Sequence, residues 1–187
     1  YDDFIGYNIG ITSDFDPLTG LPSNIQVYRY AANSKNQVTT TGLSLGLHYY
    51  LNDHHTLNFN YSFNQLLKES EVFDPIIPAF NTPKHKFNIG INGEHLMEQT
   101  NGNDWGYSLN YKWIEGFLFE GSPQFTGMIP TYDLVDAQVN YQIKKANLNV
   151  KLGASNLMNN MQFQTYGGPR IGRLAYLSLR YEFQKTK

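Results

Sequence analysis

The 187 residues include no cysteine, which excludes a disulfide scaffold and thiolate metal sites. Charged residues make up only 16 %, against about a quarter in ordinary soluble domains. The formal net charge is −2, so the chain lacks the basic footprint of a nucleic-acid-binding protein. This shortage of charge suggests that something other than water covers part of the surface.

Long apolar runs are also missing, and no stretch reaches the 18 residues that a transmembrane helix needs. The first residue is Tyr1, and no charged segment followed by an apolar one marks a signal peptide. These absences leave a membrane location open. A transmembrane strand exposes only every second residue to lipid, so its mean hydropathy can stay low.

Aromatic residues are abundant at 15 %, with 14 Tyr and 12 Phe. Much of the chain alternates between apolar and polar residues, which predicts β-strands. In 133–144, for example, Val135, Val139 and Tyr141 alternate with Asp136, Gln138 and other polar residues. We predict eight strands, the second with a break near 33–36, over these ranges: 1–11, 25–51, 56–66, 84–96, 104–116, 131–144, 147–158 and 173–183.

The connections between these strands alternate in length. Long ones are expected at 12–24, 67–83, 117–130 and 159–172, and short ones at 52–55, 97–103 and 144–147. In an antiparallel sheet, the long connections then share one edge and the short turns share the other. Outer-membrane barrels show this asymmetry, with short periplasmic turns and longer external loops.

Aromatic side chains gather at both ends of the predicted apolar face. The inner group, near the short turns, is Tyr49, Trp105, Tyr107, Tyr141 and Tyr181; the outer group is Phe63, Phe87 and Trp113. Two aromatic girdles around an aliphatic band match a bilayer with two interfaces. We therefore predict an all-β fold, an antiparallel transmembrane β-barrel in contact with lipid.

A soluble carbohydrate-binding β-sandwich is an alternative, because its strands also alternate. It would place Trp105 and Trp113 along a groove. The water-facing side of a sandwich usually carries many Lys, Glu and Arg, whereas the polar residues here are mainly Asn, Ser, Gly and Gln. Such small, uncharged residues are better suited to a crowded or water-filled lumen.

The last strand carries a separate signal. Its apolar side ends on an aromatic and consists of Ala175, Leu177, Leu179, Tyr181 and Phe183. This pattern resembles the C-terminal assembly signal of outer-membrane barrels, and the resemblance implies capture by the barrel-assembly machinery. An open strand edge in lipid is costly, so the last strand must be paired before closure. The polar tail 184–187 departs from the pattern.

Several segments together resemble the C-terminal barrel region of TonB-dependent outer-membrane receptors. They are "YDDFIGY" (1–7), "NSKNQVTTTGLSLGLHYYLND" (33–53), "TPKHKFNIGI" (82–91), "VDAQVNYQI" (135–143), "LGASNLMNN" (152–160) and "YGGPRIGRLAYLSLRYEF" (166–183).

The resemblance implies a 22-stranded barrel with an N-terminal plug, of which residues 1–183 would supply the last part. It implies nutrient uptake across a Gram-negative outer membrane, coupling to TonB through a missing N-terminal part, and pairing with a surface lipoprotein. A complete eight-stranded barrel, acting as an anchor or adhesion protein, stays open as an alternative.

Residues for specific chemistry are few, and we expect no enzyme and no cofactor. "GGPRIG" (167–172) fits neither phosphate-binding fingerprint and predicts a turn into the last strand. We expect His54 and His55 to form a turn, and Asp14 and Asp16 an external loop, rather than metal sites. Ser44 and His48 are four residues apart on one strand, too far for a direct hydrogen bond. The predicted ligand or partner surface comprises Phe73, Ile76, Ile77, Phe80 and Arg170.

Overall fold

The computed structural model describes residues 5–34, 37–68, 79–96, 102–121 and 125–183. These residues form two units, one of 1–41 with 65–80 and the other of 42–64 with 81–187. Nearly all the regular structure is antiparallel β-strand. No helix in these ranges is long and apolar enough to cross a membrane.

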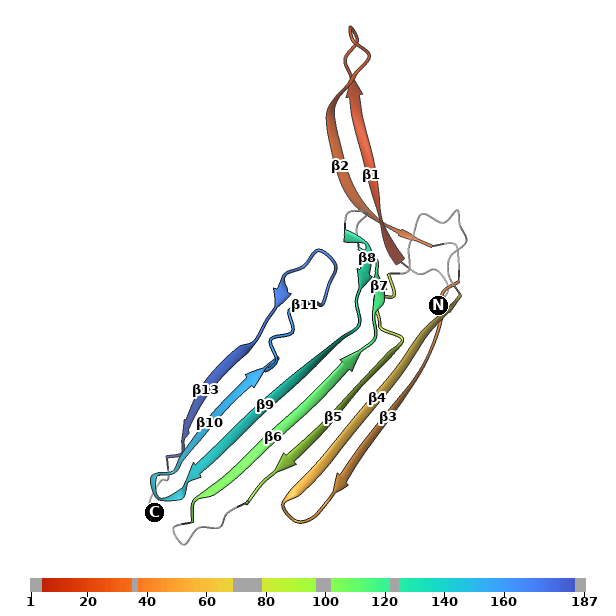
Figure 1. The fold of residues 1–187 in the computed structure, drawn as a ribbon. Coiled ribbons are helices and arrows are strands. Elements are labelled where there is room, and N and C mark those ends of the chain that lie inside the picture. Colours follow the sequence, from red (N-terminus) through yellow and green to blue (C-terminus); the bar gives the residue numbers. More distant parts are fainter. Residues whose placement is uncertain (1–4, 35–36, 69–78, 97–101, 122–124, 184–187) are drawn as a thin grey trace. The chain divides into compact units, whose positions relative to one another are not determined.

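A seven-stranded sheet dominates the second unit, in the order β13-β10-β9-β6-β5-β4-β3 (Figure 1). Its strands are bounded as follows: β3 (Thr39–Tyr50), β4 (His55–Lys68), β5 (His85–Gly93), β6 (Asp104–Ile114), β9 (Tyr132–Ile143), β10 (Leu148–Ser155) and β13 (Leu174–Tyr181). Neighbours in space are successive long strands of the sequence, so the sheet is a simple up-and-down meander.

Short turns join the strands at one edge of this sheet. Asn52 Oδ1 accepts hydrogen bonds from the backbone N–H groups of His54 and His55, each at 2.9 Å, and closes the β3–β4 turn. The 3-10 helix η2 (Lys144–Ala146) joins β9 to β10, and Asn147 leaves it with a left-handed φ of 47°. Asn tolerates this conformation better than most residues, which explains so tight a reversal.

The opposite edge carries the longer connections, as the sequence predicts. Two of them contain small hairpins that the alternation of the sequence does not predict. They pair β7 (Phe117–Phe119) with β8 (Gly127–Ile129), and β11 (Gln162–Phe163) with β12 (Arg170–Ile171). The predicted turn at 167–172 is confirmed in part: it leads into β13, but Arg170–Ile171 form the short strand β12.

The first unit contains a two-stranded hairpin of β1 (Ile5–Phe15) and β2 (Pro22–Asn33). Here one prediction was wrong, and the strand count was one too low. Residues 12–24 are not a long loop, because both strands extend into this range and only 16–21 connect them. The predicted strand 25–51 is two strands, β2 and β3, separated at the expected break, so the described chain has nine long strands and not eight.

The hairpin turn has a local physical cause. Asp16 Oδ1 accepts the N–H of Leu18 at 2.8 Å, and the Gly20 N–H donates to the Asp16 carbonyl at 2.8 Å. Gly20 has a φ of 67°, a conformation that glycine adopts without strain. Pro22 is tolerated because it occupies the first position of its strand. Asp14 and Asp16 thus serve the hairpin, where Asp14 accepts from Asn24 Nδ2.

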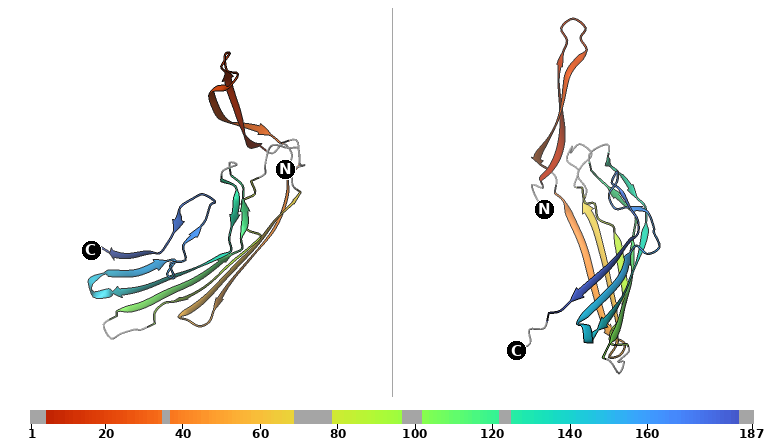
Figure 2. Two further views of the ribbon diagram at one scale, coloured as in Figure 1. Left: turned by 45° about the horizontal axis from the view of Figure 1, so that its top comes forward. Right: turned by 90° about the vertical axis from the view of Figure 1, so that its left-hand side faces the viewer.

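The seven-stranded sheet is curved and open (Figure 2). Its edge strands, β3 and β13, each pair with a single neighbour within the described ranges. A closed eight-stranded barrel is therefore not the arrangement in this structure. Hollows of about 580 Å³ and 250 Å³ are lined mostly by polar residues of alternate strand positions, so the polar face is the concave one.

Candidate functional site: the two faces of the sheet

Strand register places the apolar side chains of six of the seven strands on one face. The bond between His48 and Asn58 puts the polar side of β3 with that of β4, so the apolar side chains of β3 share this face. Across the middle of the sheet, Leu57, Ile91, Leu109, Ala137, Ala154 and Ala175 form one continuous row. A second row of the same face joins Tyr107, Val139, Leu152 and Leu177. The alternation predicted from the sequence is thus consistent between strands, since a slip of one residue anywhere would reverse a strand's faces.

This apolar face is exposed. Leu109 is 45 % exposed, Leu152 is 62 % and Leu177 is 65 %. Only three apolar side chains are buried within the described residues: Val38, Ile129 and Tyr132. A β-sandwich would bury such a face against a second sheet, whereas the other described sheets have two strands each. The face therefore has the character of a surface in contact with lipid.

Aromatic rings mark both ends of the apolar face. Near the short turns, Trp105 and Tyr141 lie opposite each other with ring centroids 4.6 Å apart. Near the long connections, Phe87 and Trp113 are stacked at 5.5 Å. The two tryptophans are eight residues apart on β6, or about 27 Å along the strand. Tilted by roughly 40°, that spacing covers on the order of 20 Å of membrane thickness, close to the apolar band of known barrels.

The other predicted girdle residues are on the same face. Tyr49 and Tyr181 are exposed at the short-turn ends of their strands, and Tyr107 is half-buried one row inward. Neither tryptophan lines the two hollows, which lie over the polar face. The role of these aromatics as an interfacial girdle stays a prediction, and their positions agree with it.

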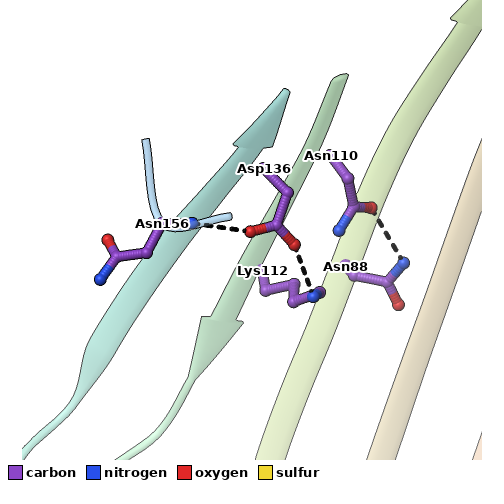
Figure 3. Close-up of polar contacts among 5 residues, drawn as sticks. All are labelled: Asn88, Asn110, Lys112, Asp136 and Asn156. Carbon is purple, nitrogen blue, oxygen red and sulfur yellow. Dashed lines mark hydrogen bonds and ion pairs between the residues drawn. The ribbon is translucent and has the colours of Figure 1, made fainter. Parts of the chain in front are cut away.

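The polar, concave face is lined by carboxamides, hydroxyls and glycines, together with charged side chains such as Lys151, Arg180 and Glu182. Amide side chains bond to one another across strands, as in Asn88 Nδ2 to Asn110 Oδ1 at 3.3 Å (Figure 3). Large side chains lie over glycines of the neighbouring strand: a Cβ at Gly106 would be 2.7 Å from Asn140 Oδ1, and one at Gly153 would be 2.5 Å from the Tyr176 ring. This alternation of large and small residues explains the many glycines.

One ion pair crosses the concave face near its long-connection edge. Lys112 Nζ on β6 is 2.7 Å from Asp136 Oδ2 on β9, and the backbone N–H of Asn156 donates to Asp136 Oδ1 at 2.9 Å (Figure 3). In the sequence, Asp136 stands out only as one polar residue of an alternating strand. Nothing in the alternation distinguishes it from Gln138 or Asn140, because its partners come from other parts of the chain.

Histidines of the sheet have structural partners. The His48 side chain bonds to Asn58 on the neighbouring strand. His55 Nδ1 is 3.0 Å from Asn52 Oδ1 in the turn. His85 Nδ1 is 2.7 Å from the Tyr61 hydroxyl on the apolar face. No group of three or more potential metal ligands occurs in the part of the chain that the structure describes.

The predicted ligand surface is only partly visible. Phe73, Ile76 and Ile77 lie outside the described residues, and Phe80 is half-buried. Arg170 lies on β12 with its guanidinium 4.7 Å from the centroid of the Phe163 ring, a cation–π contact. Arg170 is therefore near the long-connection edge of the sheet.

The predicted assembly signal occupies an edge of the sheet. β13 pairs with β10 on one side alone within the described ranges, and its apolar residues Leu177, Leu179 and Tyr181 are exposed. Ala175 belongs to the same face. Phe183 is 90 % exposed and contacts the Tyr181 ring edge-to-face at 4.8 Å. Recognition of this strand during assembly stays a prediction.

Together, an exposed apolar face banded by aromatics and a concave polar face define the wall of a transmembrane β-barrel. Residues 1–157 match the family model described as "TonB dependent receptor-like, beta-barrel". The chain belongs to this family, which comprises receptors and transporters of the Gram-negative outer membrane rather than enzymes. A search of curated proteins found no match.

Proposed function

We propose that this chain forms the closing part of the barrel wall of a receptor that imports a nutrient across the outer membrane. Residues 1–183 make up this wall and its external extensions, followed by the tail 184–187. The single observation that carries the proposal is the division of the sheet into an exposed apolar face and a concave polar face. The apolar face meets lipid, and the polar face lines the lumen.

The edges of the sheet set the orientation. The short turns face the periplasm and the long connections face outward, as in outer-membrane barrels generally. The hairpin β1–β2 enters β3 at its Thr39 end, which is the long-connection end. The external connections are therefore the part that meets a ligand. The residues proposed to contact the ligand are Phe73, Ile76, Ile77, Phe80 and Arg170. A surface lipoprotein is the proposed partner on this side.

Energy for import comes from TonB, which acts on a part of the receptor other than the barrel wall. The barrel itself reaches the membrane through the barrel-assembly machinery, which would engage β13. Among the described residues β13 pairs on one side alone, which supports this step, because an unpaired backbone edge is a template for strand addition.

Import can be tested in a strain that lacks the receptor gene. The strain is complemented with the full receptor and supplied with scarce nutrients one class at a time: ferric chelates, cobalamin, oligosaccharides and peptides. We expect uptake of one class to require both the receptor and TonB. The control is a receptor that ends before β13. Uptake that persists without TonB, or in the truncated control, would contradict the proposal.

A further inference from the structure

A β-bulge ends the pairing of β10 with β9. The register is regular up to Ala154, opposite Ala137, but the N–H of Leu157 then donates to the carbonyl of Val135 at 2.7 Å. One extra residue is thus inserted, and Asn156 takes a φ of 50°. A bulge of this kind bends the strand and releases a backbone group from the ladder. The bulge forms the root of the external connection 156–173.

The released group is held by the wall. Asp136 Oδ1 accepts the Asn156 N–H at 2.9 Å, while its Oδ2 is 2.7 Å from Lys112 Nζ (Figure 3). One carboxylate therefore joins β6, β9 and the root of the connection. Hydrogen bonds to an ionised group are roughly twice as strong as neutral ones. The side chains of Asp136 and Lys112 are 27 % and 43 % exposed, so both are reachable from the concave face.

Hydrogen bonds within the connection 156–173 link the held residue Asn156 to the rest of the connection. Asn156 is buried, with 5 % of the residue exposed. Its side-chain amide donates to the carbonyls of Asn160 and Ile171, and its side-chain oxygen accepts the N–H of Asn160 at 2.8 Å. Asn159 Oδ1 accepts the N–H of Arg173 at 2.9 Å. The outgoing and returning halves of the connection are thus tied together directly above the bulge.

The connection also packs against its neighbour, the β7–β8 hairpin. A Cβ on Gly127 would be 2.3 Å from the Tyr166 ring, and one on Gly167 would be 2.3 Å from the Phe125 ring. Each ring therefore rests on the backbone of the other connection. The hairpin is bonded in turn to the segment before β5, since Asn81 and Glu120 exchange hydrogen bonds of 3.0 Å and 2.7 Å.

We propose that Asp136 is a positioning residue that couples the inner wall of the barrel to the conformation of the external connections. It acts through Asn156, which orders 156–173, and through the aromatic contacts that extend this order to 117–121 and 125–129. A molecule in the lumen that draws Lys112 or Asp136 away would loosen the root of the connection. This inference does not depend on which nutrient is imported. It rests on the proposed function in one respect, that the concave face lines the lumen.

Hydrogen exchange of the full receptor in detergent, read by mass spectrometry, tests this coupling. We expect the amides of 156–160 to exchange about tenfold faster in Asp136→Ala, since the lost bonds involve a charged group. Asp136→Asn keeps an acceptor oxygen and should lie between wild type and Asp136→Ala. The matched control is Gln138→Ala, on the same strand and face, which loses only its bond from the Tyr176 hydroxyl.

A second readout separates positioning from general loosening of the barrel. Spin labels at Met128→Cys and Met158→Cys, both exposed positions, report the distance between the two connections. Asp136→Ala should broaden this distance distribution, and Gln138→Ala should leave it narrow. The proposal is overturned if both Asp136 variants exchange as wild type does. It is equally overturned if strand 148–155 loses protection as strongly as 156–160.

Discussion

Trp105 and Tyr141 face each other across β6 and β9, with ring centroids 4.6 Å apart and planes inclined by 42°. The pair lies at the short-turn end of the apolar face, where a bilayer would change from hydrocarbon to headgroups. Indole and phenol rings suit this depth because each combines an apolar body with a polar group. The pairing of β6 with β9 thus brings two rings together at the depth where they would hold the barrel in the membrane.

The coupling between these two rings can be measured with a double-mutant cycle. We expect Trp105→Ala and Tyr141→Ala to be coupled by about 0.5–1.5 kcal/mol in the free energy of unfolding, the usual range for such ring pairs. The measurement is denaturant unfolding of the receptor in lipid vesicles. Trp113→Ala with Tyr141→Ala serves as the control cycle, because distant sites normally add. Equal coupling in both cycles would contradict a direct contact.

A charge in the middle of the apolar face should separate the lipid side from the lumen side. Leu109→Arg is expected to lower the free energy of unfolding by about 2–4 kcal/mol, the cost of arginine at the bilayer midplane. Ser108→Arg, one residue earlier, turns toward the polar face and should cost much less. Unfolding in lipid vesicles measures both. Similar losses for the two variants would argue against lipid contact at Leu109.

Asn147 should be sensitive to the shape of its side chain rather than to its chemistry. Its φ of 47° closes the turn between β9 and β10, and its N–H donates to the Lys144 carbonyl at 3.1 Å. Asn147→Gly should change stability little, whereas Asn147→Val should cost roughly 1–2 kcal/mol because a branched Cβ is strained there. The control is Asn149→Val, within β10. The idea fails if Asn147→Val unfolds at the wild-type denaturant concentration.

Phe183 offers a way to separate assembly from stability. Its side chain is 90 % exposed, so Phe183→Ala should change the free energy of unfolding by less than about 1 kcal/mol. If this aromatic is part of the assembly signal, the amount of folded receptor in the outer membrane should still fall several-fold. Quantitative blots of membrane fractions measure that amount. Phe15→Ala removes another exposed aromatic, on the β1–β2 hairpin, and should leave the amount unchanged.

Sequence alternation predicted the strands of the large sheet closely because each strand has one apolar and one polar face. The ends of Asp104–Ile114 and Tyr132–Ile143 differ from the predicted ranges by only one or two residues. The prediction failed at 12–24, where Pro and Gly suggested a long loop. The strands continue there because Asp16 and Gly20 need only a short turn, and backbone pairing between β1 and β2 outweighs weak strand propensity.

The sequence by itself determined the class of fold, the two faces of the wall and the family, because these depend on local alternation and on short motifs. Tertiary structure alone decided which polar residues act together. Asp136 meets Lys112 from 24 positions earlier and Asn156 from 20 positions later. Such contacts depend on which residues of neighbouring strands are paired and on one bulge. An alternating pattern predicts neither the pairing partners nor the bulge. The anchor of the external connections is therefore a property of the folded sheet.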